Sequence, residues 1–243
     1  MPRRDAAPHL RIREIQTEAD PAWRRAYRLL ARVFPRSEMM PQSAWTHVMR
    51  ERNAGVWADL SWHLFVAEYR GRTVGAATGA YLGNVNVGLV GYVAVTARAR
   101  SYGIGPRLRW ALRLAFQRDA HRLTGRLLEA MVGEVRPDNP WLRRLLQGGA
   151  IALDLPYHQP SLRRRGKDVP LVLYYQSLRA PRRSIAVTEV RRLLYTIWRR
   201  AYRVPKPLAR PAFRRMLHAL EGRERIGQRP VGPRAPDGPS AVA

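Results

Sequence analysis

The sequence predicts an α/β protein in which a mixed β-sheet is covered by helices on both faces. Segments of strand composition alternate along the chain with segments of helical periodicity, which indicates helices packed in layers on a sheet. Two strand-like segments flank Arg70-Gly71-Arg72 with the spacing of a hairpin, so part of the sheet is antiparallel. With 243 residues, 46% of them hydrophobic, the chain can enclose a sizeable core.

The first third of the chain predicts a strand followed by two helices. Residues 10–15 alternate weakly between apolar and polar side chains, as a strand does. Asp20-Pro21 supplies an N-cap and a first-turn proline for a helix over 22–33. A loop bounded by prolines, 34–41, separates this helix from a short one over 42–52.

The middle of the chain continues the alternation of strands and helices. Val, Ile and aromatic residues mark the strands, and Pro or Gly marks the ends of the helices. The predicted strands cover residues 63–69, 73–82, 89–95, 126–135, 151–155 and 170–176. The predicted helices run from 106 to 118 and from 140 to the Gly148-Gly149 pair.

The pattern changes near residue 184, where apolar residues recur at helical spacing between arginine pairs. A second helix is predicted over 208–220, and the residues after it are rich in Pro, Gly and Arg without apolar periodicity. We therefore divide the chain into a domain over 1–180, a basic helical extension over 181–221 and a disordered tail over 222–243.

Composition excludes several classes of chemistry. The chain has no Cys, which rules out disulfides, zinc–thiolate sites and cysteine nucleophiles, and we expect no metal. It has no signal-peptide pattern and no run of about 18 apolar residues, so we expect a cytoplasmic protein without a transmembrane segment. The net charge of +26, densest after residue 180, favours phosphate-rich partners or anionic lipid.

The segment over 91–106 carries the strongest chemical signal, because it joins a strand to a helix through a glycine-containing loop. Gly103 and Gly105 lack the Cβ atoms that would block close approach of a ligand, and Pro106 suits a first helical turn. Backbone N–H groups over 101–105 would converge on an anion at the positive end of the helix, with Arg98 and Arg100 adding charge. The pattern predicts a pyrophosphate site, and neither GxxxxGK[ST] nor GxGxxG fits it.

Arg100-x-x-Gly103-x-Gly105 resembles the (Q/R)xxGx(G/A) signature of the GNAT superfamily of acyl-CoA-dependent N-acyltransferases, and the strand before it is similar to that family's. A second segment, Glu134 to Pro140, resembles the family's strand-to-helix junction, and Gly148-Gly149-Ala150 stands where a Gly-Phe often ends that helix. The resemblance covers Leu10 to Gln176.

The resemblance implies a mostly antiparallel sheet of about six to seven strands with a central splay, flanked by helices. It also implies transfer of an acetyl or other acyl group from acyl-CoA, the co-substrate, to a primary amine by direct attack through a tetrahedral intermediate. A backbone N–H near Val93 or Ala94 would polarise the thioester carbonyl. The residues expected to bind CoA are Val93, Ala94, Val95, Arg98, Arg100, Ser101, Tyr102, Gly103, Ile104, Gly105, Pro106 and Asn139.

The attacking amine must lose a proton, so we expect a carboxylate near the thioester. The candidates are Glu134, Glu129 and Glu38, and the odd spacing of the first two places them on opposite faces of a strand. The tyrosine that many family members carry on the helix after Asn-Pro is missing from residues 141–146. Either the thiolate departs without an acid, or Tyr157 or His158 protonates it.

The resemblance to this family implies that the acceptor of the acyl group is a small-molecule or peptide amine. Trp23, Trp45, Trp57 and Trp62 lie where the family builds its acceptor site, and they fit an aromatic pocket or a core equally well. The alternative function is a nucleic-acid-associated basic protein whose GNAT-like domain binds acyl-CoA or is accessory. The arginine pairs of the extension are interleaved with Tyr195, Trp198 and Tyr202, which suits RNA stacking. The same residues suit a membrane-surface anchor or a helix face docked on the domain.

Overall fold

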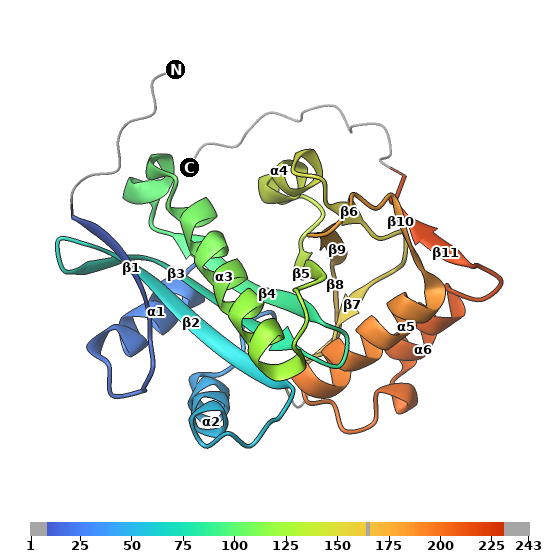
Figure 1. Ribbon diagram of the computed structural model, residues 1–243, viewed down its shortest axis with the longest axis horizontal. Helices are drawn as coiled ribbons and strands as arrows, with labels where there is room; N and C mark the ends of the chain where they lie inside the picture. Colours follow the sequence, from blue (N-terminus) through green and yellow to red (C-terminus); the bar gives the residue numbers. More distant parts are fainter. Residues whose placement is uncertain (1–8, 164–165, 231–243) are drawn as a thin grey trace.

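The computed structural model describes residues 9–163 and 166–230. Its centre is a seven-stranded sheet in the order β1-β2-β3-β4-β5-β9-β6 (Figure 1). Every neighbouring pair is antiparallel except β4 and β5, which are parallel. This confirms the predicted mixed, mostly antiparallel sheet. The strands are β1 (Leu10–Glu14), β2 (Leu60–Tyr69), β3 (Arg72–Leu82), β4 (Val87–Val95), β5 (Ala130–Val135), β6 (Ile151–Ala152) and β9 (Val172–Ser177).

The hairpin from which an antiparallel part of the sheet was predicted joins β2 to β3. Tyr69 pairs with Arg72, which leaves Arg70 and Gly71 as a two-residue turn. Both have positive φ, 48° and 72°, as a type I′ turn requires. This turn type matches the twist of the strands and sets their register.

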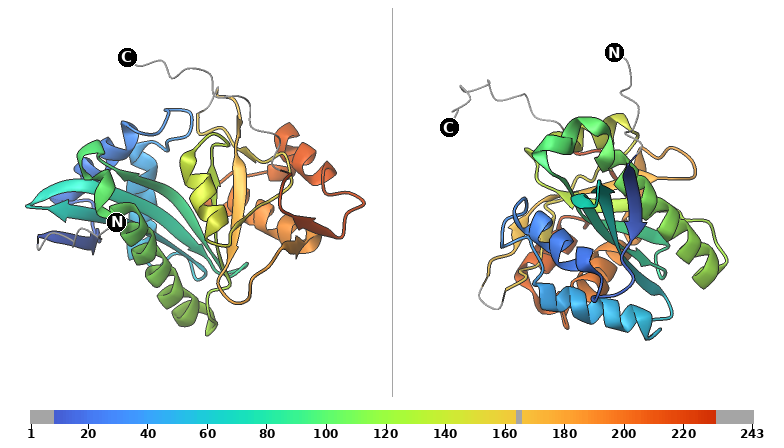
Figure 2. Two further views of the ribbon diagram at one scale, coloured as in Figure 1. Left: turned by 90° about the horizontal axis from the view of Figure 1, so that it is seen from above. Right: turned by 90° about the vertical axis from the view of Figure 1, so that its left-hand side faces the viewer.

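Helices cover both faces of the sheet (Figure 2). Successive residues of β2 show the division, because Phe65 packs with α3 (Ile104–Thr124) and Leu64 packs with α1 (Pro21–Ala31) and α2 (Gln42–Asn53). Asp20 caps α1 as predicted, accepting a hydrogen bond from the N–H of Ala22. The remaining helix of the middle region is α4 (Pro140–Gln147).

The residues after 180 share a core with the sheet on the face that carries α1 and α2. They form β10 (Ser184–Ala186), α5 (Val187–Thr196), a π-helical turn η2 (Ile197–Ala201), a 3-10 turn η3 (Pro207–Ala209) and α6 (Pro211–His218). Trp198 and Phe213 are fully buried in one cluster with Val132 of β5 and Leu173 of β9. The division of the chain at residue 180 stays a prediction.

The prediction of a disordered tail is wrong for its first part. β11 (Arg225–Gly227) pairs with β10, and Ile226 is 0% exposed in the shared core. A single apolar residue between arginines has no periodicity, so the sequence pattern missed it. Residues 231–243 of the predicted tail lie outside the described part of the chain. A further two-stranded pair joins β7 (His158–Gln159) to β8 (Val169–Pro170).

The predicted central splay lies between β4 and β5. The two strands pair only from Val87 to Val90 of β4, and beyond this point β5 continues beside β9 alone. On its other edge β4 has a bulge, where Gly91 and Tyr92 together oppose Thr78 of β3. A Cβ on Gly91 would lie 2.9 Å from the Thr78 hydroxyl oxygen, so glycine permits the bulge. A bulge bends its strand, and this one lies at the point where the pairing of β4 with β5 ends.

Within residues 9–163 and 166–230, no helix combines the length and the apolar character needed to cross a membrane.

Candidate functional site

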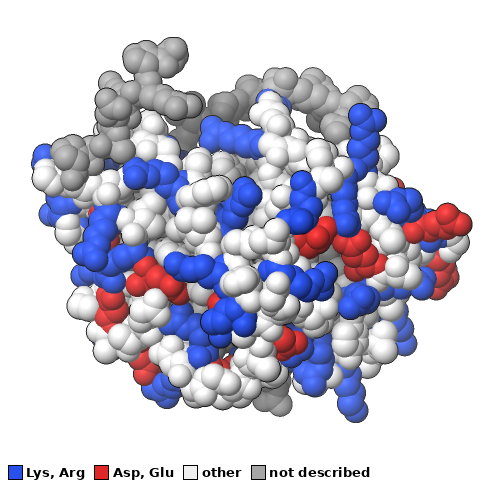
Figure 3. Space-filling view, in the orientation of Figure 1, with Lys and Arg blue, Asp and Glu red and all other residues white. Residues whose placement is uncertain are grey.

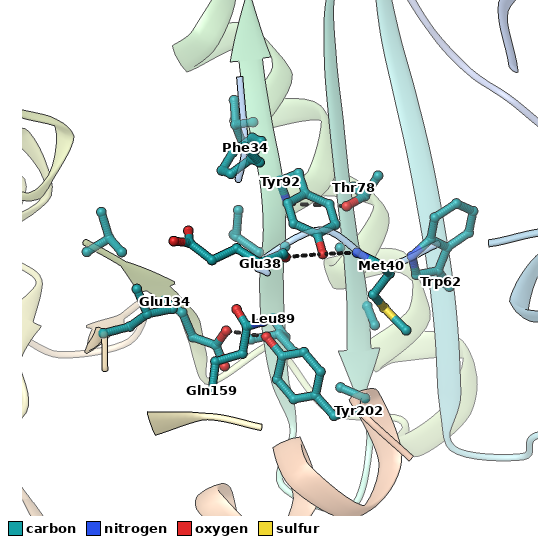
Figure 4. A pocket seen from close by; sticks show the side chains of 18 of the residues that line it. Phe34, Glu38, Met40, Trp62, Thr78, Leu89, Tyr92, Glu134, Gln159 and Tyr202 are labelled. Atoms are coloured by element: carbon teal, nitrogen blue, oxygen red, sulfur yellow. Dashed lines mark hydrogen bonds between the residues drawn. The ribbon is translucent and has the colours of Figure 1, made fainter. Parts of the chain in front are cut away.

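A cavity of about 230 Å³ lies at the splay, between the α1–α2 region and the residues after 180 (Figure 4). Its walls come from seven parts of the chain: the loop after α1, α2, strands β2 to β4, β5, the loop between β5 and α4, the β7–β8 region and residues 200–203. Its lining is mostly apolar or aromatic, with two carboxylates, Glu38 and Glu134, among it.

Glu134 lies on β5 and is held by two tyrosines. The hydroxyls of Tyr157 and Tyr202 each donate to one of its carboxylate oxygens. Alternation along β5 places Glu134 on the same face as Val132, which packs against the residues after 180. The exposed part of Glu134 lines the cavity. Burial raises the pKa of Glu134 to about 7, helped by the charge of Glu38 and opposed by the two tyrosine hydrogen bonds.

This pKa has a consequence for stability. The pKa of Glu134 rises from 4.5 to about 7 on folding, so the folded protein binds more protons than the unfolded chain between these values. The stabilisation is complete below pH 4.5 and is lost as pH rises through about 7. We expect wild type to lose about 3 kcal/mol relative to Glu134→Gln between pH 4 and pH 8. Urea unfolding of both proteins across this range measures it, and a pH-independent difference would contradict the burial of the carboxylate.

Glu38 reaches the same cavity from the loop after α1, so the structure brings two of the three carboxylate candidates together. It is 6% exposed, and its Oε1 accepts from Nη1 of Arg136 at 3.0 Å. Tyr92 fixes this loop over β4, because its hydroxyl donates to the Glu38 carbonyl at 2.8 Å and accepts from the Met40 N–H at 3.0 Å. Figure 4 shows Glu38, Tyr92 and Met40 together at the cavity.

The third carboxylate candidate, Glu129, is set apart from this cavity. It precedes β5, five residues and about 16 Å of strand from Glu134, and its Oε1 accepts from Nη2 of Arg182 at 2.7 Å. Tyr157 is 1% exposed and lies outside the cavity lining, with its hydroxyl on Glu134. His158 binds the Pro156 carbonyl through Nδ1 at 2.8 Å.

The backbone N–H groups of β4 divide between its two edges. The N–H of Tyr92 donates to the Thr78 hydroxyl at 3.2 Å and that of Thr96 to the Val74 carbonyl at 2.9 Å, so both point toward β3. Because N–H directions alternate along a strand, those of Val93 and Val95 point toward the splay, and that of Ala94 points toward β3. Of the two residues expected to polarise a carbonyl, the geometry favours Val93.

The glycine loop lies at the end of β4. Residues 97–102 form the 3-10 turn η1 (Ala97–Tyr102), and α3 begins at Ile104, two residues earlier than predicted. Gly103 precedes it with φ 67°, a conformation that side chains disfavour, and no atom lies within 4 Å of a Cβ built there. The N–H groups of Ile104 and Gly105 lack intrahelical partners because they open the helix.

The other expected CoA residues surround this helix start. Arg98, Arg100, Ser101, Tyr102 and Pro106 are exposed. Asn139 borders the cavity and also caps α4, its Oδ1 accepting from the Trp141 N–H at 2.9 Å.

Three residues that line the cavity were not predicted as site residues from the sequence: Tyr202, Gln159 and Thr78. Tyr202 lies 68 residues from its partner Glu134, a pairing that no local pattern encodes. Gln159 is 3% exposed and lies in the short strand β7, within a segment that the sequence predicts to be a connecting loop. Of the four tryptophans considered for an acceptor pocket, Trp45 and Trp62 line the cavity.

The structure removes two of the three aromatic side chains that the sequence offered for stacking on nucleic-acid bases. Trp198 is buried and Tyr202 faces the cavity, so of the three aromatic side chains suited to base stacking only Tyr195, 43% exposed, is on the surface. Figure 3 shows Lys and Arg spread over one face of the molecule with acidic residues among them. Nucleic-acid binding stays a prediction.

The family model described as the acetyltransferase (GNAT) family matches residues 23–147, more than half of the 243 residues. The chain belongs to this family. GNAT enzymes use acetyl-CoA as co-substrate and act on amines, so this GNAT protein is an N-acetyltransferase in general terms. No curated protein matches the chain.

Several solved structures are similar to this chain at low sequence identity. A protein assigned to the GNAT family from Bacteroides thetaiotaomicron is 18% identical with a TM-score of 0.58, covering 80% of this chain and 99% of that chain. Ard1 from Thermoplasma volcanium is 17% identical with a TM-score of 0.49, covering 71% of this chain and 99% of that chain. The ribosomal-protein-S18-alanine N-acetyltransferase from Escherichia coli is 14% identical with a TM-score of 0.48, covering 70% and 94%. At 18% identity, the likeness to the Bacteroides structure shows the fold alone.

Proposed function

We propose that this protein transfers the acetyl group of acetyl-CoA to a primary amine held in the cavity, with Glu134 as the base. The observation that supports this most is a carboxylate with a pKa of about 7 that lines a cavity at the open end of the splay. A base whose pKa lies near the working pH is present in its ionised form and still accepts a proton readily.

The β4 edge and the start of α3 together fit acetyl-CoA. The free N–H groups of Val93 and Val95 would pair with the pantetheine arm, and that of Val93 would donate to the thioester oxygen. The N–H groups of Ile104 and Gly105, at the positive end of a 21-residue helix, would hold the pyrophosphate with Arg98 and Arg100 beside it. The glycine at 103 leaves the space in front of this loop open.

The residues act in a defined order on this proposal. Glu134 takes a proton from the amine, whose nitrogen then bonds to the thioester carbon. The Val93 N–H stabilises the oxyanion of the tetrahedral intermediate. The carbon–sulfur bond breaks, and the thiolate takes up a proton from solvent or from Glu134. Tyr157 and Tyr202 position the Glu134 carboxylate, and Tyr157 is unsuited to act as the acid because its hydroxyl is buried on Glu134.

We expect the release of the CoA thiol from acetyl-CoA to depend on an added primary amine.

We expect Gly103→Val to weaken CoA binding at least roughly tenfold. A β-branched residue is strained at φ 67°, and its side chain would stand in the space left for the pyrophosphate. Thiol release across a panel of amines and calorimetric titration with CoA are the two measurements.

Gly125→Val is the matched control for this variant. Gly125 ends the same helix with φ 64° and also has no atom within 4 Å of a built Cβ, so the backbone strain is the same but the loop is untouched. Equal CoA affinity for the two folded variants would show that the loop does not hold the pyrophosphate.

A further inference from the structure

Residues 200–203, which we call the strap, join the two sides of the cavity. On one side Tyr202 donates to Glu134 of β5. On the other side Arg200 binds both carboxylate oxygens of Asp59, at 2.9 and 2.6 Å, and Arg203 binds Glu51 of α2. All four strap residues line the cavity. The strap therefore forms a wall of the cavity that links β5 to α2 and to Asp59.

One wall of the cavity is aromatic. Tyr92 packs edge-on against Phe34, with ring centroids 5.0 Å apart, and stacks at 6.1 Å on Trp45. Trp62 lies 5.6 Å from Trp45 and completes this wall. Such a surface favours an apolar or aromatic body, because it offers few partners for polar groups.

One buried polar group in the cavity lacks a partner. Gln159 is 3% exposed and lines the cavity, and its Nε2 has no hydrogen bond with any described residue. Figure 4 shows it in the same part of the cavity as Glu134 and Tyr202. Because a buried amide without a partner costs free energy, a ligand oxygen that accepts from it would bind favourably.

We propose, resting on the function above, that the acceptor is a small primary amine with an apolar body about the size of one ring and a hydrogen-bond acceptor near the amine. The amine lies between Glu134 and Glu38, the ring lies against Phe34 and Tyr92, and the oxygen accepts from Gln159. A volume of about 230 Å³ lies below the range of about 300–1,000 Å³ typical of drug-sized ligands. With the strap in place, a polypeptide in the cavity would bury backbone N–H and C=O groups, each of which would need a partner, so we expect a polypeptide to bind poorly.

The test compares three probes: 2-amino-1-phenylethanol, 2-phenylethylamine and an alanine-rich hexapeptide with a free amino terminus. For wild type we expect kcat/KM to fall in this order, with the peptide at least roughly a hundredfold below the amino alcohol. Opening the strap in Arg200→Ala/Arg203→Ala should lower the ratio of amino alcohol to peptide at least tenfold. Gln159→Leu should remove the preference for the amino alcohol over 2-phenylethylamine.

Arg223→Ala is the matched control, since it removes a pair with Asp154 in the same terminal region, outside the cavity lining. It should leave the ratio of amino alcohol to peptide unchanged. A wild type that prefers the hexapeptide, or a strap variant with an unchanged ratio, would overturn the inference. If no amine is acetylated, the proposed function fails. Calorimetric titration of the amino alcohol in the presence of CoA then still tests this inference. Binding of the amino alcohol would support it, and the lack of binding would overturn it.

Discussion

Replacing Glu134 by Gln should lower kcat/KM for acetyl transfer at pH 7 by roughly 10²–10⁴-fold. Glutamine keeps the size of the side chain and an oxygen for a tyrosine hydroxyl, but it cannot accept the proton of the amine. The loss should shrink as pH approaches the pKa of the acceptor amine, because a neutral amine needs no base. In wild type kcat/KM should fall as pH drops below about 7, where Glu134 takes up a proton.

Steady-state kinetics across pH 6 to 9 measure this prediction, and Glu129→Gln is the matched control. Glu129 lies immediately before the start of β5, where Arg182 donates to it, so its replacement should leave kcat/KM within about twofold of wild type. A greater loss for Glu129→Gln than for Glu134→Gln would move the base to the other end of β5. A loss for Glu134→Gln that stays constant with pH would assign Glu134 a structural role.

Trp198→Ala should lower the free energy of unfolding by about 3–5 kcal/mol. Trp198 is 0% exposed and packs on Phe213 with ring centroids 5.1 Å apart, and its Nε1 donates to the His158 carbonyl at 3.2 Å. Its loss leaves a cavity between the helices after 180 and the sheet. Leu208→Ala is the control, because Leu208 is 59% exposed in the same region. Urea unfolding gives both values.

The same core predicts what truncation does. Removing the residues from 181 onward uncovers the side of β5 and β9 that Trp198 and Phe213 cover, so we expect the fragment to aggregate. Residues 222–243 are predicted from the sequence to be a disordered tail. Their removal should nevertheless also destabilise the protein, because it removes the buried side chain of Ile226. A soluble, monomeric 1–180 fragment that binds CoA would show that the domain boundary at 180 is real and the docked helices are dispensable.

The features that local sequence specifies were predictable. The Arg70-Gly71 turn, the Asp20 cap and Gly103 each depend on a few adjacent residues with distinct backbone preferences. The order of strands and helices followed from periodicity, and the splay followed from the resemblance to a family. The boundaries were less accurate, as for α3, which starts at Ile104 because Gly103 allows the helix to begin immediately after η1.

The features that depend on distant residues were not predictable. The sequence pattern does not distinguish Glu129 from Glu134. Only the tertiary packing decides that it is Glu134 that meets the hydroxyls of Tyr157 and Tyr202. The apolar spacing around Trp198 correctly gave a helix, but no pattern showed that the chain beyond it would turn Tyr202 back into the cavity. Ile226 was missed for the same reason, since its partners lie in β10 and the shared core.

Because the strap lies near the carboxyl-terminal end of the chain, the cavity can be completed only after most of the chain has been synthesised. Its contacts join residues 68, 141 and 152 positions apart, from Tyr202 to Glu134, Arg200 to Asp59 and Arg203 to Glu51. Contacts of such long sequence separation form late, because long loops must close first. A nascent chain that has released only the sheet therefore has an open, incomplete cavity, and its walls meet only after residue 203 has folded back.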